Sequence, residues 1–241
     1  MSRIDSLHAL SEFAPLAQHE LELMSAQIIP AGAALVLHPR DATHFPILHW
    51  RNGTCARARI DGDELVGDIS GDIGHLQADD ESFDIVVVQH GAEMLRATDE
   101  LIAEIDRVLA ADGRLYWFGL NPLNPWCVMK QGRQRVARSE TAADRLYFHS
   151  ARRIENELGR CAIVVDKSIF FGGWWPRNGE LPDRSGNGAS RNNLFDGLSA
   201  AYLLSARKQR AALTPIPPAR LRPRLSVAGG LAAPASGRIA A

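Results

Sequence analysis

The central part of the chain, residues 76–122, alternates between strand and helix patterns. The run Ile85-Val86-Val87-Val88 is unbroken, branched and apolar, which is typical of a parallel strand that is covered on both faces. Thr98 is a candidate N-cap for a helix that follows, and Asp112-Gly113 is its candidate stop. The apolar stripe of that helix consists of Leu101, Ile102, Ile105, Val108 and Leu109. A second strand, 115–118, completes a unit that predicts a right-handed crossover in an open α/β sheet.

Ligands of such sheets bind beyond the carboxyl ends of the strands. Gln89 and His90 end the first of these strands, and Gly119 and Asn121 stand at the end of the second. We therefore expect a site at this edge, with His90 as the catalytic base if the reaction needs one. A purely structural histidine at this position is an equally open interpretation.

This stretch also resembles a known family of enzymes. The segments Ser82-Phe83-Asp84, Glu104-Ile105-Asp106-Arg107-Val108-Leu109 and Asp112-Gly113-Arg114 are similar to class I methyltransferases that use S-adenosylmethionine. Their type 11 group, related to the ubiquinone-biosynthesis methylases, has the most similar pattern. The resemblance continues to Asn121-Pro122 and to a last strand, 202–208. It implies a Rossmann-like class I methyltransferase fold of the α/β class, with a mostly parallel sheet and an antiparallel last strand.

The resemblance also implies S-adenosylmethionine as the cofactor and assigns residues to it. Asp72 matches the acid that faces the adenine amine, and Ile73 follows it in the same segment. Asp61, at the end of an expected second strand, would hold the ribose hydroxyls. Gln89 would line the cofactor cleft beside His90.

The chain departs from the family after its expected first strand, 33–37. A working member has a Gly-x-Gly-x-Gly loop there, whose glycines let the backbone approach the cofactor. Here the strand is followed by His38-Pro39-Arg40, without glycine, and proline lacks a backbone donor. If the site works, the backbone from His38 to Arg40 would bind the methionine end. The departure leaves two readings: a methyltransferase acting on a small-molecule oxygen, carbon or nitrogen, or a non-catalytic binding or regulatory protein of the same fold.

Charge divides the chain into a methyltransferase-like domain, 1–209, and a basic tail, 210–241. The chain has 27 Lys and Arg and 28 Asp and Glu, and five of the arginines lie in the tail, which has no acid. That leaves 22 bases against 28 acids in residues 1–209. The tail is rich in Ala, Pro and Gly without apolar periodicity, so we expect it to be disordered. Its charge could attract nucleic acid or another anion, although a solubilising tail, or one that lies on the acidic body, is the favoured interpretation.

A second basic run, Lys130, Arg133, Arg135 and Arg138, follows the strand at 115–118. In the resembling family this region borders the substrate opening, so it could guide an anionic small molecule. A solvated surface loop is the alternative. Trp126, just before the run, could line an apolar pocket or pack in a core.

The remaining expectations concern the ends of the domain and its surroundings. Leu21, Met24 and Ile28 predict a helix over 16–28, and partly periodic apolar residues predict another over 142–158. No apolar run approaches 18 residues, and no basic region followed by an apolar stretch opens the chain, so a cytoplasmic protein without a membrane span is expected. The three cysteines are widely spaced and suggest no metal site.

Overall fold

A computed structural model of the protein describes residues 14–39, 50, 52–136, 145–172 and 198–209. The predicted tail, 210–241, lies outside these residues. The described helices are α2 (Ala14–Gln27), the 3-10 helix η1 (Ala92–Met94), α3 (Asp99–Val108), α4 (Pro125–Val136) and α5 (Ala151–Arg160). The described strands are β1 (Ala31–Pro39), β2 (Asn52–Asp61), β3 (Glu64–Gly67), β4 (Gly71–Asp72), β5 (His75–Leu76), β6 (Phe83–Gln89), β7 (Leu109–Leu120), β8 (Ile163–Phe171) and β9 (Ala201–Lys208).

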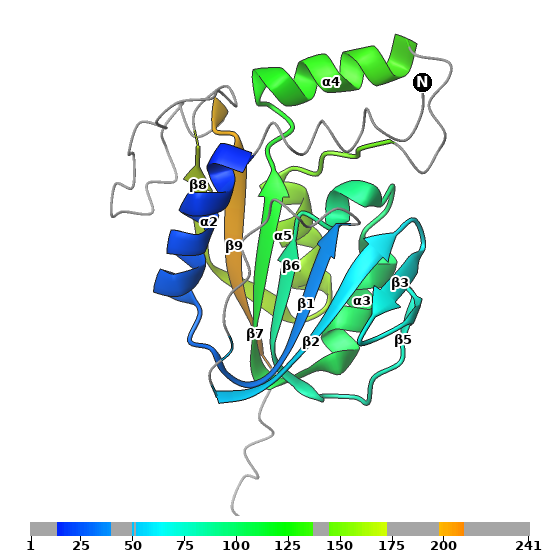
Figure 1. The fold of residues 1–241 in the computed structure, drawn as a ribbon, viewed down its shortest axis with the longest axis vertical. Helices are drawn as coiled ribbons and strands as arrows, with labels where there is room; N and C mark the ends of the chain where they lie inside the picture. Colours follow the sequence, from blue (N-terminus) through cyan, green and yellow to red (C-terminus); the bar gives the residue numbers. More distant parts are fainter. Residues whose placement is uncertain (1–13, 40–49, 51, 137–144, 173–197, 210–241) are drawn as a thin grey trace, which may run out of the picture. The chain divides into compact units, whose positions relative to one another are not determined.

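These strands form one sheet in the order β5-β4-β3-β2-β1-β6-β7-β9-β8 (Figure 1). β1 pairs in parallel with β2 and β6, and β6 pairs in parallel with β7. The last strand, β9, runs antiparallel between β7 and β8. The predicted fold class is therefore confirmed. The antiparallel edge of β3, β4 and β5 was not predicted, because these short polar segments carry no apolar alternation.

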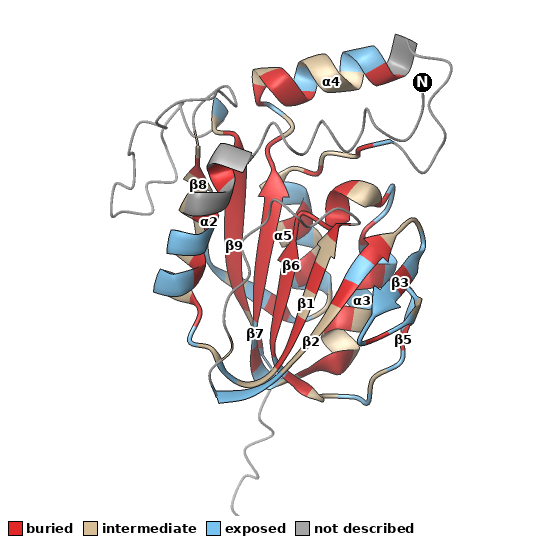
Figure 2. Ribbon diagram, viewed as in Figure 1, coloured by how far each residue is buried: buried red, intermediate tan, exposed pale blue. Residues whose placement is uncertain are grey.

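Helices cover both faces of the sheet (Figure 1). α3 and α5 lie on one face, where residues such as Ile105 and Leu158 pack against Val86 and Trp117. α2 lies on the other face, where Met24 belongs to the cluster built around β6 and β7. Figure 2 shows that β6, β7 and β9 are largely buried, whereas the β3 edge is largely exposed. The unbroken apolar runs of the parallel strands reflect this double cover.

Two details of the helix predicted between Thr98 and Asp112-Gly113 differ in the structure. Thr98 does occupy the N-cap position of α3, but its hydroxyl donates to the Glu157 carboxylate of α5 and makes no cap hydrogen bond. Asp112 does not stop the helix, because α3 already ends at Val108. Asp112 instead adopts a left-handed conformation (φ 62°) inside β7, where the pairing with β6 changes register.

The predicted helix over 142–158 is wrong at its start. Residues 145–150 are not helical, and α5 begins only after Ser150, whose side chain accepts a hydrogen bond from the Arg153 backbone N–H at 3.3 Å. The apolar residues before it serve the core instead: the Phe148 ring packs edge-on against Trp126, with ring centroids 6.2 Å apart. Residues 142–144 lie outside the described part of the chain.

Candidate functional site

The carboxyl ends of the parallel strands meet at one edge of the sheet, at the top of Figure 1. β1 ends at Pro39, β2 at Asp61, β6 at Gln89 and β7 at Leu120. This is the edge at which open α/β sheets bind ligands.

Gly91 lets the chain after β6 close down on the ends of β1 and β2. A Cβ at this position would lie 2.6 Å from Ile60 Cδ1 and 3.7 Å from the carbonyl carbon of His38. A larger residue would therefore push the loop away from these strands. Because glycine has no Cβ, the loop that carries His90 can lie close to the end of β1.

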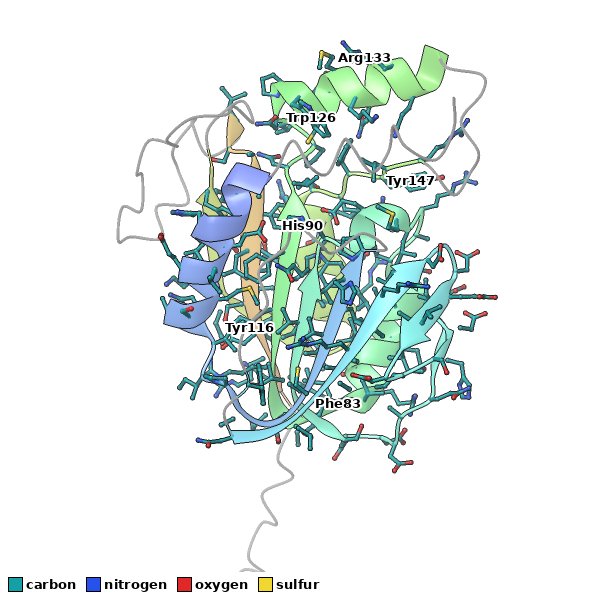
Figure 3. All side chains as sticks on the ribbon, in the orientation of Figure 1. Phe83, His90, Tyr116, Trp126, Arg133 and Tyr147 are labelled. Atoms are coloured by element: carbon teal, nitrogen blue, oxygen red, sulfur yellow. The ribbon has the colours of Figure 1, made fainter. Side chains whose placement is uncertain are left out.

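His90 is held between two carboxylates from different parts of the chain. Its Nε2 lies 2.6 Å from Oε1 of Glu20, in α2, and its Nδ1 lies 3.6 Å from Oε1 of Glu93, in η1. All three side chains are at most 2% exposed. The His90 backbone is left-handed (φ 50°), a conformation that is costly for a residue with a Cβ. Figure 3 shows His90 at the upper end of the central strands, with Trp126 on α4 above it.

Gln89 engages the same carboxylate as His90. Its Nε2 donates to Glu20 Oε2 at 3.2 Å and lies 4.0 Å from the Met24 sulfur. Glu20 therefore uses one oxygen for each of the two residues that the sequence placed at the end of β6. Both predicted residues are present at the edge, but their side chains are buried against α2.

Glu93 links the cluster of Glu20, Gln89 and His90 to the end of β7. Its Oε1 accepts a hydrogen bond from the backbone N–H of Leu120, at the end of β7, at 2.6 Å. Its Oε2 is buried and has no hydrogen-bond partner among the described residues. The end of β7 and the end of β6 are thus tied through one carboxylate.

The charges of this cluster fix the protonation state of His90. Burial by itself would lower the pKa of the imidazole, because it disfavours the charged form. The carboxylates of Glu20 and Glu93 outweigh burial and raise the pKa from 6.5 to about 10. His90 is therefore an imidazolium at neutral pH, with no lone pair to accept a proton while Glu20 stays in contact.

The predicted acids Asp61 and Asp72 lie in one row across the sheet. Asp61 of β2 pairs with Glu64 of β3, and Glu64 pairs with Asp72 of β4. Directly opposite residues of antiparallel strands project to the same face, so these three carboxylates share one side of the sheet. Two strand spacings separate the outer pair, roughly 10 Å at the backbone. Like charges placed opposite one another are unfavourable, although Glu64 and Asp72 are exposed to solvent.

The segment of Asp72 and Ile73 is tied to its own hairpin. Asp72 is exposed, and its Oδ1 accepts a hydrogen bond from the backbone N–H of Gly74 at 2.9 Å. Ile73 is buried, and its backbone N–H donates to the carbonyl of Asp63 at 3.0 Å. The Asp72 side chain therefore faces solvent, whereas Ile73 belongs to the core.

The end of β1 is strand rather than loop. β1 continues through His38 to Pro39, two residues beyond the expected end, and Pro39 pairs with Ile60 of β2. The Nδ1 of His38 lies 2.9 Å from the carbonyl oxygen of Pro39. Arg40, the third residue assigned to the methionine end, lies outside the described residues.

The sequence interpretation missed Glu20 and Glu93. A signal for Glu20 was present, because Leu16, Glu20, Met24 and Ile28 follow one another at four-residue spacing on a single helix face. That face is buried, whereas Leu21, which was assigned to it, is exposed. An acid within an apolar stripe predicts a buried charge with a partner. Glu93 carried no comparable signal in the sequence.

The described part of the second basic run belongs to a helix, not to a surface loop. Lys130 and Arg133 lie on α4, half-buried and exposed respectively, and Trp126 is buried in its first turn. The side chain of Arg135 and the whole of Arg138 lie outside the described part of the chain. Among the described residues, no group of three or more His, Cys, Asp or Glu is arranged to hold a metal ion. No described helix is long and apolar enough to cross a membrane.

Comparisons with known proteins agree with the fold. The sequence model of a family described as a methyltransferase domain matches residues 51–117. A structure from Thermotoga maritima, described as a SAM-dependent methyltransferase and possible histamine N-methyltransferase, has a TM-score of 0.53 at 13% identity and covers 82% of this chain and 90% of its own. Among proteins with curated descriptions, none is similar in sequence to this chain.

Two further structures are less similar. A SAM-dependent methyltransferase from Methanosarcina mazei has a TM-score of 0.47 at 13% identity, covering 78% of this chain and 97% of its own. A geranyl diphosphate C-methyltransferase from Streptomyces coelicolor, solved with Mg²⁺, geranyl diphosphate and S-adenosylhomocysteine, has a TM-score of 0.47 at 12% identity, covering 79% of this chain and 77% of its own.

Proposed function

Because the chain has the fold of the class I S-adenosylmethionine-dependent methyltransferases and matches a methyltransferase domain over residues 51–117, we propose that it transfers a methyl group from S-adenosylmethionine to a small-molecule acceptor. The observation that carries the proposal is the placement of Asp61 and Asp72 on one face beside the carboxyl edge. Carboxylates at these positions suit the hydrogen-bond donors of an adenosine.

The residues present fit the adenosine half of the cofactor best. Asp72 would accept a hydrogen bond from the adenine amine, and Asp61 would accept from the ribose hydroxyls. Ile73, whose side chain is buried in the core, would hold the segment that carries Asp72. At the methionine end the fit is poorer, because Pro39 offers no N–H and His38 carries a Cβ where the family has glycine.

When bound, S-adenosylmethionine supplies a methyl group on a positively charged sulfur, which is a strong electrophile. The protein would then need to align the acceptor with the methyl, and alignment alone can lower a barrier by several kcal/mol. Gln89 and His90 would mark the acceptor side of the cleft. The raised pKa of His90 opposes its role as a base in this arrangement, so the acceptor would have to arrive already nucleophilic. Lys130 and Arg133 on α4 favour an anionic acceptor by long-range attraction.

A second candidate function is a non-catalytic binding or regulatory module of the same fold. It is favoured by one observation: the side chains of Gln89 and His90 are bound to the Glu20 carboxylate and are at most 3% exposed. In that case the Glu20–His90–Glu93 group would be a structural core, and the carboxyl edge would serve no reaction.

Calorimetric titration of the full-length protein with S-adenosylmethionine separates the two candidates. We expect measurable binding that Asp72→Ala weakens by about five- to tenfold, the effect of losing one hydrogen-bond acceptor. Asp166→Ala, which removes an exposed acid on β8 at the opposite edge of the sheet, should leave the affinity unchanged. No binding at millimolar cofactor would reject the enzyme and favour the non-catalytic module.

A further inference from the structure

Two residues of α3, Glu104 and Arg107, bind the chain from Leu76, at the end of β5, to Asp80. Arg107 donates from Nη2 to the carbonyl of Leu76 and from Nη1 to the carbonyl of Ala78, both at 2.8 Å. Its Nη1 also lies 2.7 Å from Asp80 Oδ1. Glu104, one turn earlier, accepts a hydrogen bond from the backbone N–H of Leu76 at 2.9 Å. The N–H and the C=O of Leu76 are thus both held by α3.

Glu104 and Arg107 also bind each other, so they act as one unit, which we call the α3 clamp. Their closest contact is 2.8 Å, between Arg107 Nη2 and Glu104 Oε2. Burial would raise the pKa of the Glu104 carboxyl, but the Arg107 guanidinium and the Leu76 N–H lower it below its usual value. The carboxylate is therefore charged at neutral pH and remains a strong acceptor.

The α3 clamp holds Asp72 through the register of the hairpin. Leu76 pairs with Gly71, and His75 pairs with Asp72. β4 and β5 have only two residues each, and strands this short have little stability of their own. The position of Asp72 therefore depends on what fixes Leu76, and the α3 clamp supplies two hydrogen bonds to Leu76, one to its N–H and one to its carbonyl.

We propose that Glu104 and Arg107 are positioning residues that hold Asp72 in place for the adenine amine and so set the selectivity of the cofactor site for adenine. The inference rests on the proposed function, because it needs Asp72 to bind adenine. It assigns a role to side chains that lie on a helix behind the site and that would not touch the cofactor themselves.

The geometry requires arginine at position 107. Its planar guanidinium carries five donors in a fixed fork and reaches Glu104, two carbonyls and Asp80 together. A lysine keeps the charge, but its compact ammonium group cannot reach the carbonyls of Leu76 and Ala78 together as the guanidinium does. Arg107→Lys should release the Leu76 carbonyl, while the ion pair with Glu104 and the hydrogen bond from the Leu76 N–H to Glu104 persist.

The test compares the binding of S-adenosylhomocysteine with that of S-inosylhomocysteine, in which a carbonyl replaces the adenine amine. In the parent we expect a preference of about tenfold for the adenine form, equal to about 1.4 kcal/mol. Arg107→Lys should reduce this ratio to below about threefold. The matched control is Arg153→Lys, which alters an ion pair of 2.8 Å with Glu157 on α5 and should keep the parent's ratio.

The ratio separates positioning from general destabilisation, because a looser fold weakens both ligands alike. Glu104→Gln provides a second variant should Arg107→Lys fail to fold, and it should lower the ratio in the same way. A folded variant of either kind with the parent's ratio would overturn the inference. A parent that binds both ligands equally would overturn the role of Asp72 together with the α3 clamp, but not cofactor binding, whereas a parent that binds neither would overturn the proposed function as well.

Discussion

His90 and Glu20 lie 70 positions apart in the chain, and their side chains meet at 2.6 Å inside the protein. The contact joins the end of β6 to α2, the helix that covers the opposite face of the sheet from α3 and α5. An ion pair in such a place is costly to break, since the remaining partner would be a buried charge without compensation. Several measurable properties depend on this relationship.

Glu20→Gln should destabilise the protein by about 3 kcal/mol, because it removes the main counter-charge of a buried imidazolium. Glu22→Gln is the matched control: it lies on the same helix, its side chain is 65% exposed, and it should change stability by less than about 0.5 kcal/mol. Denaturant unfolding measures both. Equal, small effects of the two substitutions would mean that Glu20 and His90 carry no buried charge.

The stability of the protein should fall as the pH rises from about 6.5 to about 10. Over this range the folded protein keeps the proton of His90, whose pKa is raised to about 10, whereas the unfolded chain loses it near 6.5. The stabilisation by His90 is complete below pH 6.5 and is lost as the pH passes through the folded pKa. The slope from this one group approaches 1.4 kcal/mol per pH unit, as an order-of-magnitude estimate.

His90→Gln should remove that slope. Unfolding free energies at pH 7, 8 and 9 for the parent and the variant isolate the contribution of His90, because the other titrating groups are shared. Parallel pH profiles would contradict the raised pKa.

Gly119→Ala should destabilise the protein by about 1–3 kcal/mol through overpacking. A Cβ on Gly119, in β7, would overlap the ring of Tyr202, in β9. That ring is fixed, since its hydroxyl donates to the carbonyl of His149 at 2.9 Å. Gly159→Ala is the counterpart in α5, where a Cβ would meet nothing within 4 Å; it should stabilise the protein by up to about 1 kcal/mol. Thermal unfolding should shift in opposite directions for the two variants.

Introducing glycine at both His38 and Arg40 should tighten cofactor binding if the end of β1 forms part of a working site. A Cβ at these positions narrows the space that glycine leaves open in the resembling family. If the site is not used, the same change should only lower the melting temperature, because glycine adds entropy to the unfolded chain. Cofactor affinity and melting temperature, measured together, decide between these outcomes. Lower stability without a gain in affinity would favour the non-catalytic module.

Much of the fold could be predicted from the sequence, because its main elements carry local patterns. The apolar run of β6 and the stripe of α3 depend only on neighbouring residues, and both were located correctly. The hairpin of β3 to β5 was missed, since its two-residue strands are stabilised by Glu104 and Arg107 on α3 rather than by their own pattern.

The candidate site was predicted in position but not in its contacts. The sequence placed Gln89 and His90 at the carboxyl edge, where the structure has them. It could not indicate that Glu20 would bury both, because that contact depends on how α2 docks, and no local pattern encodes a partner 70 residues away. The roles assigned to Asp61 and Asp72 remain predictions for the binding experiments.

The insertion of β9 between β7 and β8 has a consequence for how the protein is made. Among the described strands, β8 joins the sheet only through β9, and β9 comes last in the chain. On a nascent chain the edge of β7 therefore stays unpaired until residues 201–208 have been synthesised. An open apolar edge of this kind is prone to pair with other chains. Pairing with other chains is therefore favoured while β1 to β8 have been synthesised and β9 has not.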